Sequence, residues 1–153
     1  MIEVEPFRLE AGVTLLDHLC GIWSVERSLQ DHASGLSGAF AGTAVFTYND
    51  GGALRHGERG SLRWAGSTPT LATRELLWRP TGSALSAEVC FPDGRLFHCL
   101  DLATGEDSPA HQCAPDVYWG EFVLEDQDQW RYTWHVEGPQ KNLTLVTSLT
   151  RAL

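Results

Sequence analysis

Two short stretches contain the side chains best suited to chemistry. They read FHCLD, from Phe97 to Asp101, and HQCAPD, from His111 to Asp116. Together they supply two histidines, two cysteines and two aspartates within twenty residues. Side chains of these types bind metals, transfer protons or act as nucleophiles.

A metal site is one interpretation, in which His111 and Cys113 chelate and His98 or Asp116 completes the ligand set. Zinc sites usually contain tighter pairs, such as C-x-x-C or H-x-x-x-H, and the chain has neither. We therefore expect no cofactor, with haem or a metal bound through His98 or His111 as the alternative. A catalytic cysteine needs a thiolate, and the favoured interpretation of the cysteines is a small buried hydrophobe.

Alternation along residues 95–102 places His98 on the face of Leu100 and Leu102, because successive strand side chains point to opposite faces. His98 is then either a buried histidine bonded to a neighbouring strand or a histidine that projects into a cavity. Arg74 is expected to point inward with Glu58 as its partner, since a buried guanidinium needs an anion. The alternative is an Arg-Glu pair on the outer face. The single lysine, Lys141, is either a reactive amine or a solvated side chain.

Most of the chain reads as short strands. Leucines at helical spacing before Gly21 predict one helix over residues 12–20. Turn sequences such as NDGG and PDG separate alternating segments, and one long connection, 103–116, is expected to be irregular. About eight to nine antiparallel strands favour a closed up-and-down barrel over a β-sandwich. The strands are predicted over residues 22–29, 39–48, 54–64, 71–78, 84–91, 95–102, 117–124, 130–136 and 143–149.

Composition limits the classes of partner. The 153 residues carry a net charge of -9, and 42% of them are hydrophobic, as in a globular chain. An acidic chain without a basic run is a poor partner for nucleic acid or an anionic membrane. The N-terminus has no signal-peptide pattern, so we expect a cytoplasmic protein with reduced thiols and a single domain over 1–153. Nothing in the sequence sets the oligomeric state.

Several motifs together resemble a lipocalin-like (calycin-type) family of small proteins classed as a domain of unknown function. The resemblance implies a barrel whose polar residues gather at one side of its cavity, without an established reaction. The family often has Tyr near the position of His56 and Asp near the position of Asn142. This chain differs at both positions, which argues against a phenol or a carboxylate role there. The motifs are GIW with Arg27, FAGTA at 40–44, ERG at 58–60, FPDGRLFH at 91–98, HQCAPDVY at 111–118, WHVEGPQK at 134–141 and the terminal Thr150-Arg151. The site residues that the resemblance implies are Glu58, Arg74, Arg95, His98, His111, Asp116, Tyr118 and Lys141.

The leading functional hypothesis is a barrel that binds one small organic ligand with a polar or anionic end. His98, Arg74 and Tyr118 would orient that end, as a few polar groups do in a mostly apolar pocket. The ligand-binding set is completed by Glu58, Arg95 and Lys141, and tryptophans would supply apolar contact. Those tryptophans are Trp23, Trp78, Trp119 and Trp134.

Two other classes stay open. In an enzyme, His98 or His111 would act as general acid or base, with Asp116 orienting the imidazole and Arg74 holding negative charge. The reaction would be an isomerisation, a cyclisation or a hydration. In a structural or interaction module, Trp119 or Trp130 would lie exposed in an apolar patch.

Overall fold

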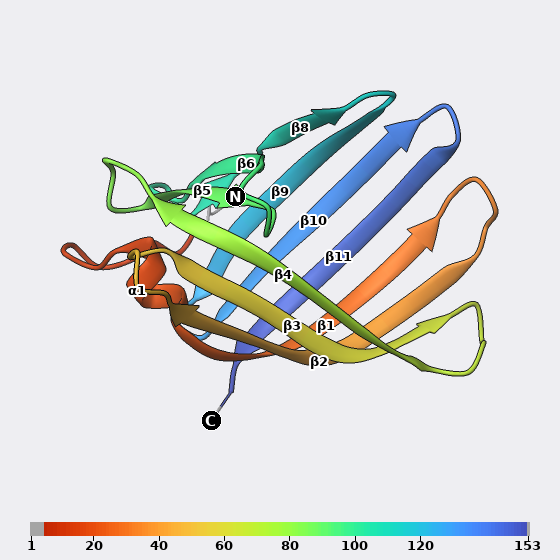
Figure 1. The fold of residues 1–153 in the computed structure, drawn as a ribbon, viewed down its shortest axis with the longest axis horizontal. Coiled ribbons are helices and arrows are strands. Elements are labelled where there is room, and N and C mark those ends of the chain that lie inside the picture. The colour runs from red at the N-terminus through yellow and green to blue at the C-terminus, as the bar shows by residue number, and fades with distance from the viewer. Residues whose placement is uncertain (1–4, 153) are drawn as a thin grey trace.

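A short helix and a long run of antiparallel strands make up the fold in a computed structural model that describes residues 5–152 (Figure 1). Helix α1 spans Leu15–Leu19. The strands are β1 (Gly21–Asp31), β2 (Ser37–Tyr48), β3 (Leu54–Trp64), β4 (Thr70–Pro80), β5 (Ser86–Cys90), β6 (Leu96–Asp101), β7 (Glu106–Asp107), β8 (Ala110–Cys113), β9 (Asp116–Asp126), β10 (Gln129–Gly138) and β11 (Lys141–Arg151).

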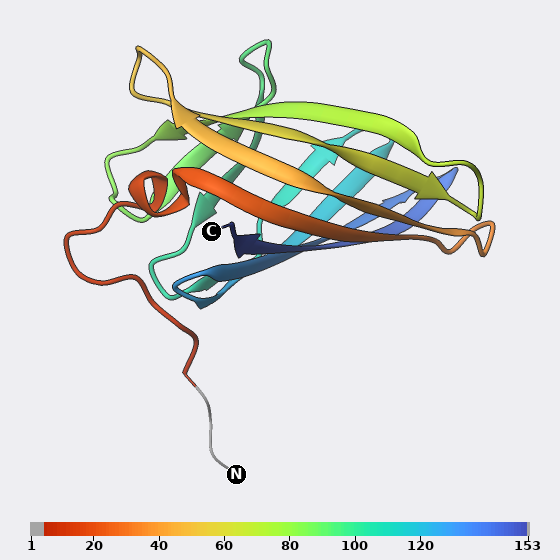
Figure 2. The same cartoon turned by 90° about the horizontal axis from the view of Figure 1, so that it is seen from below.

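The strands form one curled sheet in the order β6-β5-β4-β3-β2-β1-β11-β10-β9-β7, and β8 pairs with β9. Long strands β1 and β11, from the two ends of the chain, pair directly, which makes the sheet a nearly closed barrel (Figure 2). The all-β, up-and-down barrel predicted from the sequence is therefore confirmed. The strand count is higher than predicted, because the connection 103–116 was wrongly expected to be irregular and contains β7 and β8.

Helix α1 closes one end of the barrel and is shorter than the predicted 12–20. Gly12 has a φ of +89°, and Thr14 is extended, so neither residue is helical. The Thr14 hydroxyl accepts a hydrogen bond from the Asp17 backbone N–H at 3.1 Å and caps the first turn. Gly21, predicted as the C-cap, is instead the first residue of β1.

The core beneath the helix is aromatic. Trp23, Trp78 and Trp130 are fully buried and meet edge to face, with ring centroids 6.1–6.2 Å apart. Phe46 stacks on His56 at 4.2 Å. This end of the barrel is therefore filled by side chains.

The other end of the barrel is less complete. Strand β4 pairs with β5 only over residues 77–80, so its earlier residues have no strand partner on that side. Strand β8 pairs with β9 alone. The two unpaired edges lie at the end of the barrel opposite α1 (Figure 1). The sheet is thus split along β4, from which Arg74 projects.

A close approach between β2 and β3 shapes the wall between the two ends. Gly42 and Gly60 pair directly, and a Cβ added to Gly60 would lie 2.6 Å from the Gly42 Cα. The backbones approach closely at Gly60, whereas Gly57 has open space around it.

Among residues 5–152, no helix is both long and apolar enough to cross a bilayer.

Candidate functional site

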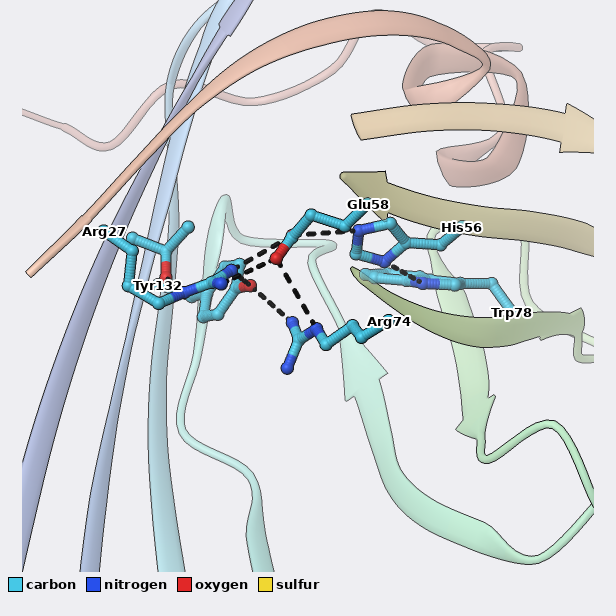
Figure 3. A network of polar contacts seen from close by, with 7 residues as sticks. Arg27, His56, Glu58, Arg74, Trp78 and Tyr132 are labelled. Carbon is cyan, nitrogen blue, oxygen red and sulfur yellow. Dashed lines mark hydrogen bonds and ion pairs between the residues drawn. The ribbon is translucent and has the colours of Figure 1, made fainter. Parts of the chain in front are cut away.

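A buried ion pair lies at the centre of the barrel. The Arg27 Nη1 donates to Glu58 Oε1 at 2.6 Å, and Nη2 donates to Oε2 at 3.0 Å (Figure 3). The Arg27 Nε donates to the Thr147 hydroxyl at 2.8 Å. Because both carboxylate oxygens of Glu58 accept from one guanidinium, the pair has the two-pronged geometry that makes such contacts strong.

Arg74 and Tyr132 extend this pair toward the split in the sheet. The Tyr132 hydroxyl accepts from Arg27 Nη2 at 3.0 Å and from Arg74 Nη2 at 2.8 Å (Figure 3). The Arg74 Nε lies 3.8 Å from Glu58 Oε1. Arg27 is almost buried, whereas the side chain of Arg74 is 39% exposed. A solute can therefore reach Arg74.

Strand register explains why these residues meet. Glu58 on β3 lies directly opposite Arg74 on β4. Arg27 on β1 lies opposite Thr147 on β11, and Thr147 lies opposite Tyr132 on β10. Side chains opposite one another in a sheet point to the same face. The two rows face each other across the barrel interior.

His56 lies behind the carboxylate, toward the aromatic core. The Trp78 indole N–H donates to His56 Nδ1 at 3.3 Å, so the hydrogen of a neutral His56 ring is on Nε2. That Nε2 lies 3.6 Å from Glu58 Oε2, longer than a hydrogen bond. Burial lowers the pKa of His56, which keeps the imidazole neutral.

The charges in the site do not cancel. Burial alone would raise the pKa of Glu58, but His56, Arg27 and Arg74 together hold it well below its usual value. Burial opposes the charge on Arg27, yet Tyr132 and Glu58 outweigh it and raise the pKa of Arg27. Two guanidinium groups therefore share one carboxylate, which leaves an excess of one positive charge.

A cavity of about 160 Å³ opens beside these groups, in the end of the barrel opposite α1. Arg27, Glu58 and Arg74 form its polar side, and the Arg27 guanidinium lies over the Phe40 ring at 5.1 Å. Its remaining lining is mostly apolar and consists of Leu29, Phe40, Leu62, Ala72, Thr73 and Leu145.

Four of the predicted site residues gather around Phe97 instead of around this cavity. The Phe97 ring lies 4.9 Å from His98, 5.2 Å from His111 and 6.1 Å from Tyr118, and it stacks on Trp134 at 5.0 Å. His98 and His111 therefore belong to one aromatic cluster, which β6, β8, β9 and β10 build. None of these residues lines the cavity beside Arg74.

His98 points to the apolar inside of the barrel, as its alternation predicted, and it is only 4% exposed. Burial lowers the pKa of His98 to about 4. The Nδ1 lies 3.2 Å from the carbonyl oxygen of Cys99, the next residue along the chain. The ring is therefore neutral near pH 7.

The remaining predicted residues lie elsewhere. Asp116 Oδ2 lies 3.3 Å from Lys141 Nζ in a rim ion pair, and no hydrogen bond within residues 5–152 joins Asp116 to a histidine. Arg95 pairs with Asp93 at 2.6 Å in an exposed turn. Neither Arg95 nor Lys141 lines the cavity.

Two further expectations are corrected by burial. Trp119, expected to contact a ligand, is instead 44% exposed, as the interaction-module alternative expected, and lies opposite His135 on the next strand. Trp130, which the same alternative named, lies in the core. Cys99 and Cys113, expected to be small buried hydrophobes, are exposed free thiols.

Arg27, Thr147 and Tyr132 were not predicted as site residues. Arg27 follows Trp23 and Val25 at alternate positions, so it shares their buried face. These alternate positions are the sequence signal that could have identified Arg27 as an inward-facing arginine in need of an anion. Nothing local to Tyr132 distinguishes it from a core aromatic.

No three His, Cys, Asp or Glu side chains come together as potential metal ligands in the part of the chain that the structure describes. The histidines that could ligate a haem iron, His98 and His111, pack against aromatic rings.

This curled antiparallel barrel, with an internal polar set and a helix over one end, is a lipocalin-like fold. Residues 19–151 match the family of unknown function DUF6314, and the chain belongs to that family. The predicted family class is thus confirmed. No curated protein matches the chain.

Two solved structures share the fold. The S-type phycobiliprotein lyase CPES from Guillardia theta is similar with a TM-score of 0.69 at 8% identity, over 90% of each chain. A protein of unknown function from the DUF3598 family of Nostoc punctiforme has a TM-score of 0.61 at 13% identity. That match covers 97% of this chain and 51% of the other, so this chain spans about half its length.

Proposed function

We propose that this protein binds one small organic anion, with the charged end at Arg74 and the apolar body in the adjoining cavity. The observation that carries the proposal is the uncancelled guanidinium charge on the polar side of an otherwise apolar cavity. An anionic group at Arg74 would balance that charge.

Arg27 has little capacity left for a ligand. Its Nε, Nη1 and Nη2 all donate to protein oxygens, and both oxygens of Glu58 accept from it. Arg74 is different, because a guanidinium carries five N–H groups and one of them is used in a hydrogen bond, to Tyr132. Its exposed side chain therefore offers donors in the fork geometry that carboxylates accept.

The lining sets the kind of ligand. Leu29, Phe40, Leu62 and Leu145 favour an apolar body, since their burial against a ligand removes apolar surface from water. The 160 Å³ cavity is smaller than the roughly 300–1,000 Å³ typical of ligand pockets. We therefore propose a compact carboxylate or a similar anion, with any longer portion leaving through the split beside β4.

The acid–base alternative has weaker support. Asp116 pairs with Lys141, so it does not orient an imidazole, and His98 is neutral and packed in an aromatic cluster. The cluster and the cavity beside Arg74 are lined by different residues. A binding function needs only the charge and shape that the cavity has.

Matched pairs of small molecules test the proposal. Benzoate and hexanoate should raise the melting temperature and shift tryptophan fluorescence, whereas benzamide and hexanamide, equal in shape but neutral, should not. Arg74→Met should weaken carboxylate binding by about tenfold or more, as expected for loss of a charge-assisted hydrogen bond. Arg55→Met is the control, because Arg55 pairs with Glu75 in an exposed ion pair. Equal binding of amides and carboxylates, or unchanged binding by Arg74→Met, would overturn the proposal.

A further inference from the structure

The Tyr132 hydroxyl has an unusual set of contacts. A hydroxyl has one hydrogen to donate and two lone pairs to accept with. Both acceptor positions of Tyr132 are filled, by Arg27 Nη2 at 3.0 Å and Arg74 Nη2 at 2.8 Å. Among residues 5–152, no protein acceptor takes the hydroxyl hydrogen, although Tyr132 is only 4% exposed. A buried donor without a partner is unfavourable, so this hydrogen needs an acceptor.

The position of the hydroxyl indicates where that acceptor lies. Tyr132 lies just behind the cavity lining: Arg27 and Arg74 both line the cavity, and the Tyr132 oxygen accepts a hydrogen bond from each. Among residues 5–152, the Tyr132 hydroxyl donates to neither Thr147, which accepts from Arg27 Nε, nor Glu58, whose two oxygens accept from Arg27.

We propose that Tyr132 donates its hydroxyl hydrogen to the anionic oxygen of the bound ligand, beside an N–H of Arg74. The two groups form a clamp with a neutral donor and a cationic donor. The ligand class is then an organic oxyanion, whose oxygen accepts two hydrogen bonds: a carboxylate, a phenolate or an enolate. This inference rests on the proposed anion-binding function and adds a second group that contacts the ligand.

Polarisation strengthens the clamp. Each guanidinium that donates to the phenol oxygen withdraws electron density from it, and a polarised hydroxyl is a stronger donor. The clamp therefore favours the ionised form of an acidic ligand over its neutral form. No covalent step is involved, and the proton remains on Tyr132.

4-Nitrophenol is a suitable probe, because its neutral and ionised forms absorb at different wavelengths. We expect the wild-type protein to bind the phenolate and to lower the apparent pKa of the bound probe. Tyr132→Phe keeps the ring and both arginines but loses the hydroxyl. It should bind the phenolate about tenfold to a hundredfold more weakly, as for loss of a hydrogen bond to a charged group, and should lower the probe pKa less.

Tyr118→Phe is the matched control. Tyr118 is also a strand tyrosine, but it packs against Phe97 and His111, and among residues 5–152 no hydrogen bond joins it to Arg27 or Arg74. It should bind the probe as the wild type does. Equal phenolate binding and an equal probe pKa in Tyr132→Phe would overturn the clamp while leaving anion binding intact. If the wild type binds neither nitrophenolate nor benzoate, both proposals fail.

A second measurement avoids any effect of substitution on folding. In wild-type protein with ¹³C-labelled tyrosine side chains, benzoate should move the Cζ resonance of Tyr132. That resonance is identified by its absence from the spectrum of Tyr132→Phe. If Tyr132→Phe does not fold, Tyr118→Phe and Tyr48→Phe identify the other two resonances and leave that of Tyr132. The resonance of Tyr118 should stay in place. A Tyr132 resonance that is unmoved at saturating benzoate would refute the donation.

Discussion

Glu58→Gln tests the central network most directly. Glutamine keeps the shape of the side chain but removes the negative charge that both guanidinium groups share. Arg27, whose side chain is 9% exposed, would then be buried without a counter-ion. Breaking a buried pair by removing one partner costs about 3–5 kcal/mol. For a chain of this size, 1 kcal/mol shifts the melting temperature by about 2–4 °C, so we expect a loss of roughly 6–20 °C.

Urea denaturation and thermal melts followed by circular dichroism measure this loss. The double variant Arg27→Met/Glu58→Leu removes both charges and should recover much of the stability, because an apolar pair of similar volume leaves no uncompensated ion. Glu75→Gln is the control, because Glu75 pairs with Arg55 at 2.5 Å on the surface. This substitution should lower the free energy of unfolding by less than about 1 kcal/mol.

The acid dependence gives an independent check with a fixed sign. The pKa of Glu58 in the folded protein is below the ordinary value of 4.5. Its contribution to stability is therefore fully present above pH 4.5 and is lost as the pH falls below that value. The difference in stability between wild type and Glu58→Gln should narrow over the same range. A variant as stable as the wild type at pH 7, or a difference that stays constant in acid, would refute the charge-balancing role of Glu58.

Three further predictions concern other parts of the barrel. Burial lowers the pKa of His98 from 6.5 to about 4, so acidification over that range should lower the free energy of unfolding of the wild type by roughly 3 kcal/mol through this group. In urea melts at a series of pH values, His98→Phe should lose less stability in acid than the wild type. An equal loss in the variant would contradict this. Gly60→Ala should lose about 1–3 kcal/mol in urea melts, because its Cβ would meet backbone, whereas Gly57→Ala, with open space, should lose almost none; equal losses would argue against the close approach. Lys141→Ala, which breaks the rim pair with Asp116, should change the melting temperature little and leave benzoate affinity unchanged. A large loss of affinity would show that Lys141 contacts the ligand.

Local sequence signals predicted the strands well. The predicted strand 54–64 has the bounds of β3, because turn sequences mark both of its ends: Asn49-Asp50-Gly51-Gly52 before it and Ser67-Thr68-Pro69 after it. The residues around Arg74 left two alternatives open, an inward arginine with Glu58 as its partner and an Arg-Glu pair on the outer face. The register sets Glu58 opposite Arg74, and the hydrogen bond from Arg74 to Tyr132 decides for the inward one. Helix length was harder to predict, because the positive φ of Gly12 and the cap at Thr14 set where the helix begins.

The sequence by itself determined which face each strand residue occupies, since that depends only on odd and even positions along one strand. It did not determine which inward residues meet. Arg27 reaches Tyr132 because β1 and β11 pair, which places Arg27 opposite Thr147, 120 residues away, and Thr147 opposite Tyr132. The register between segments so far apart is a property of the closed barrel, because it depends on how all the intervening strands twist and stagger. Closure alone therefore brought together the arginine, the tyrosine and the carboxylate of the site.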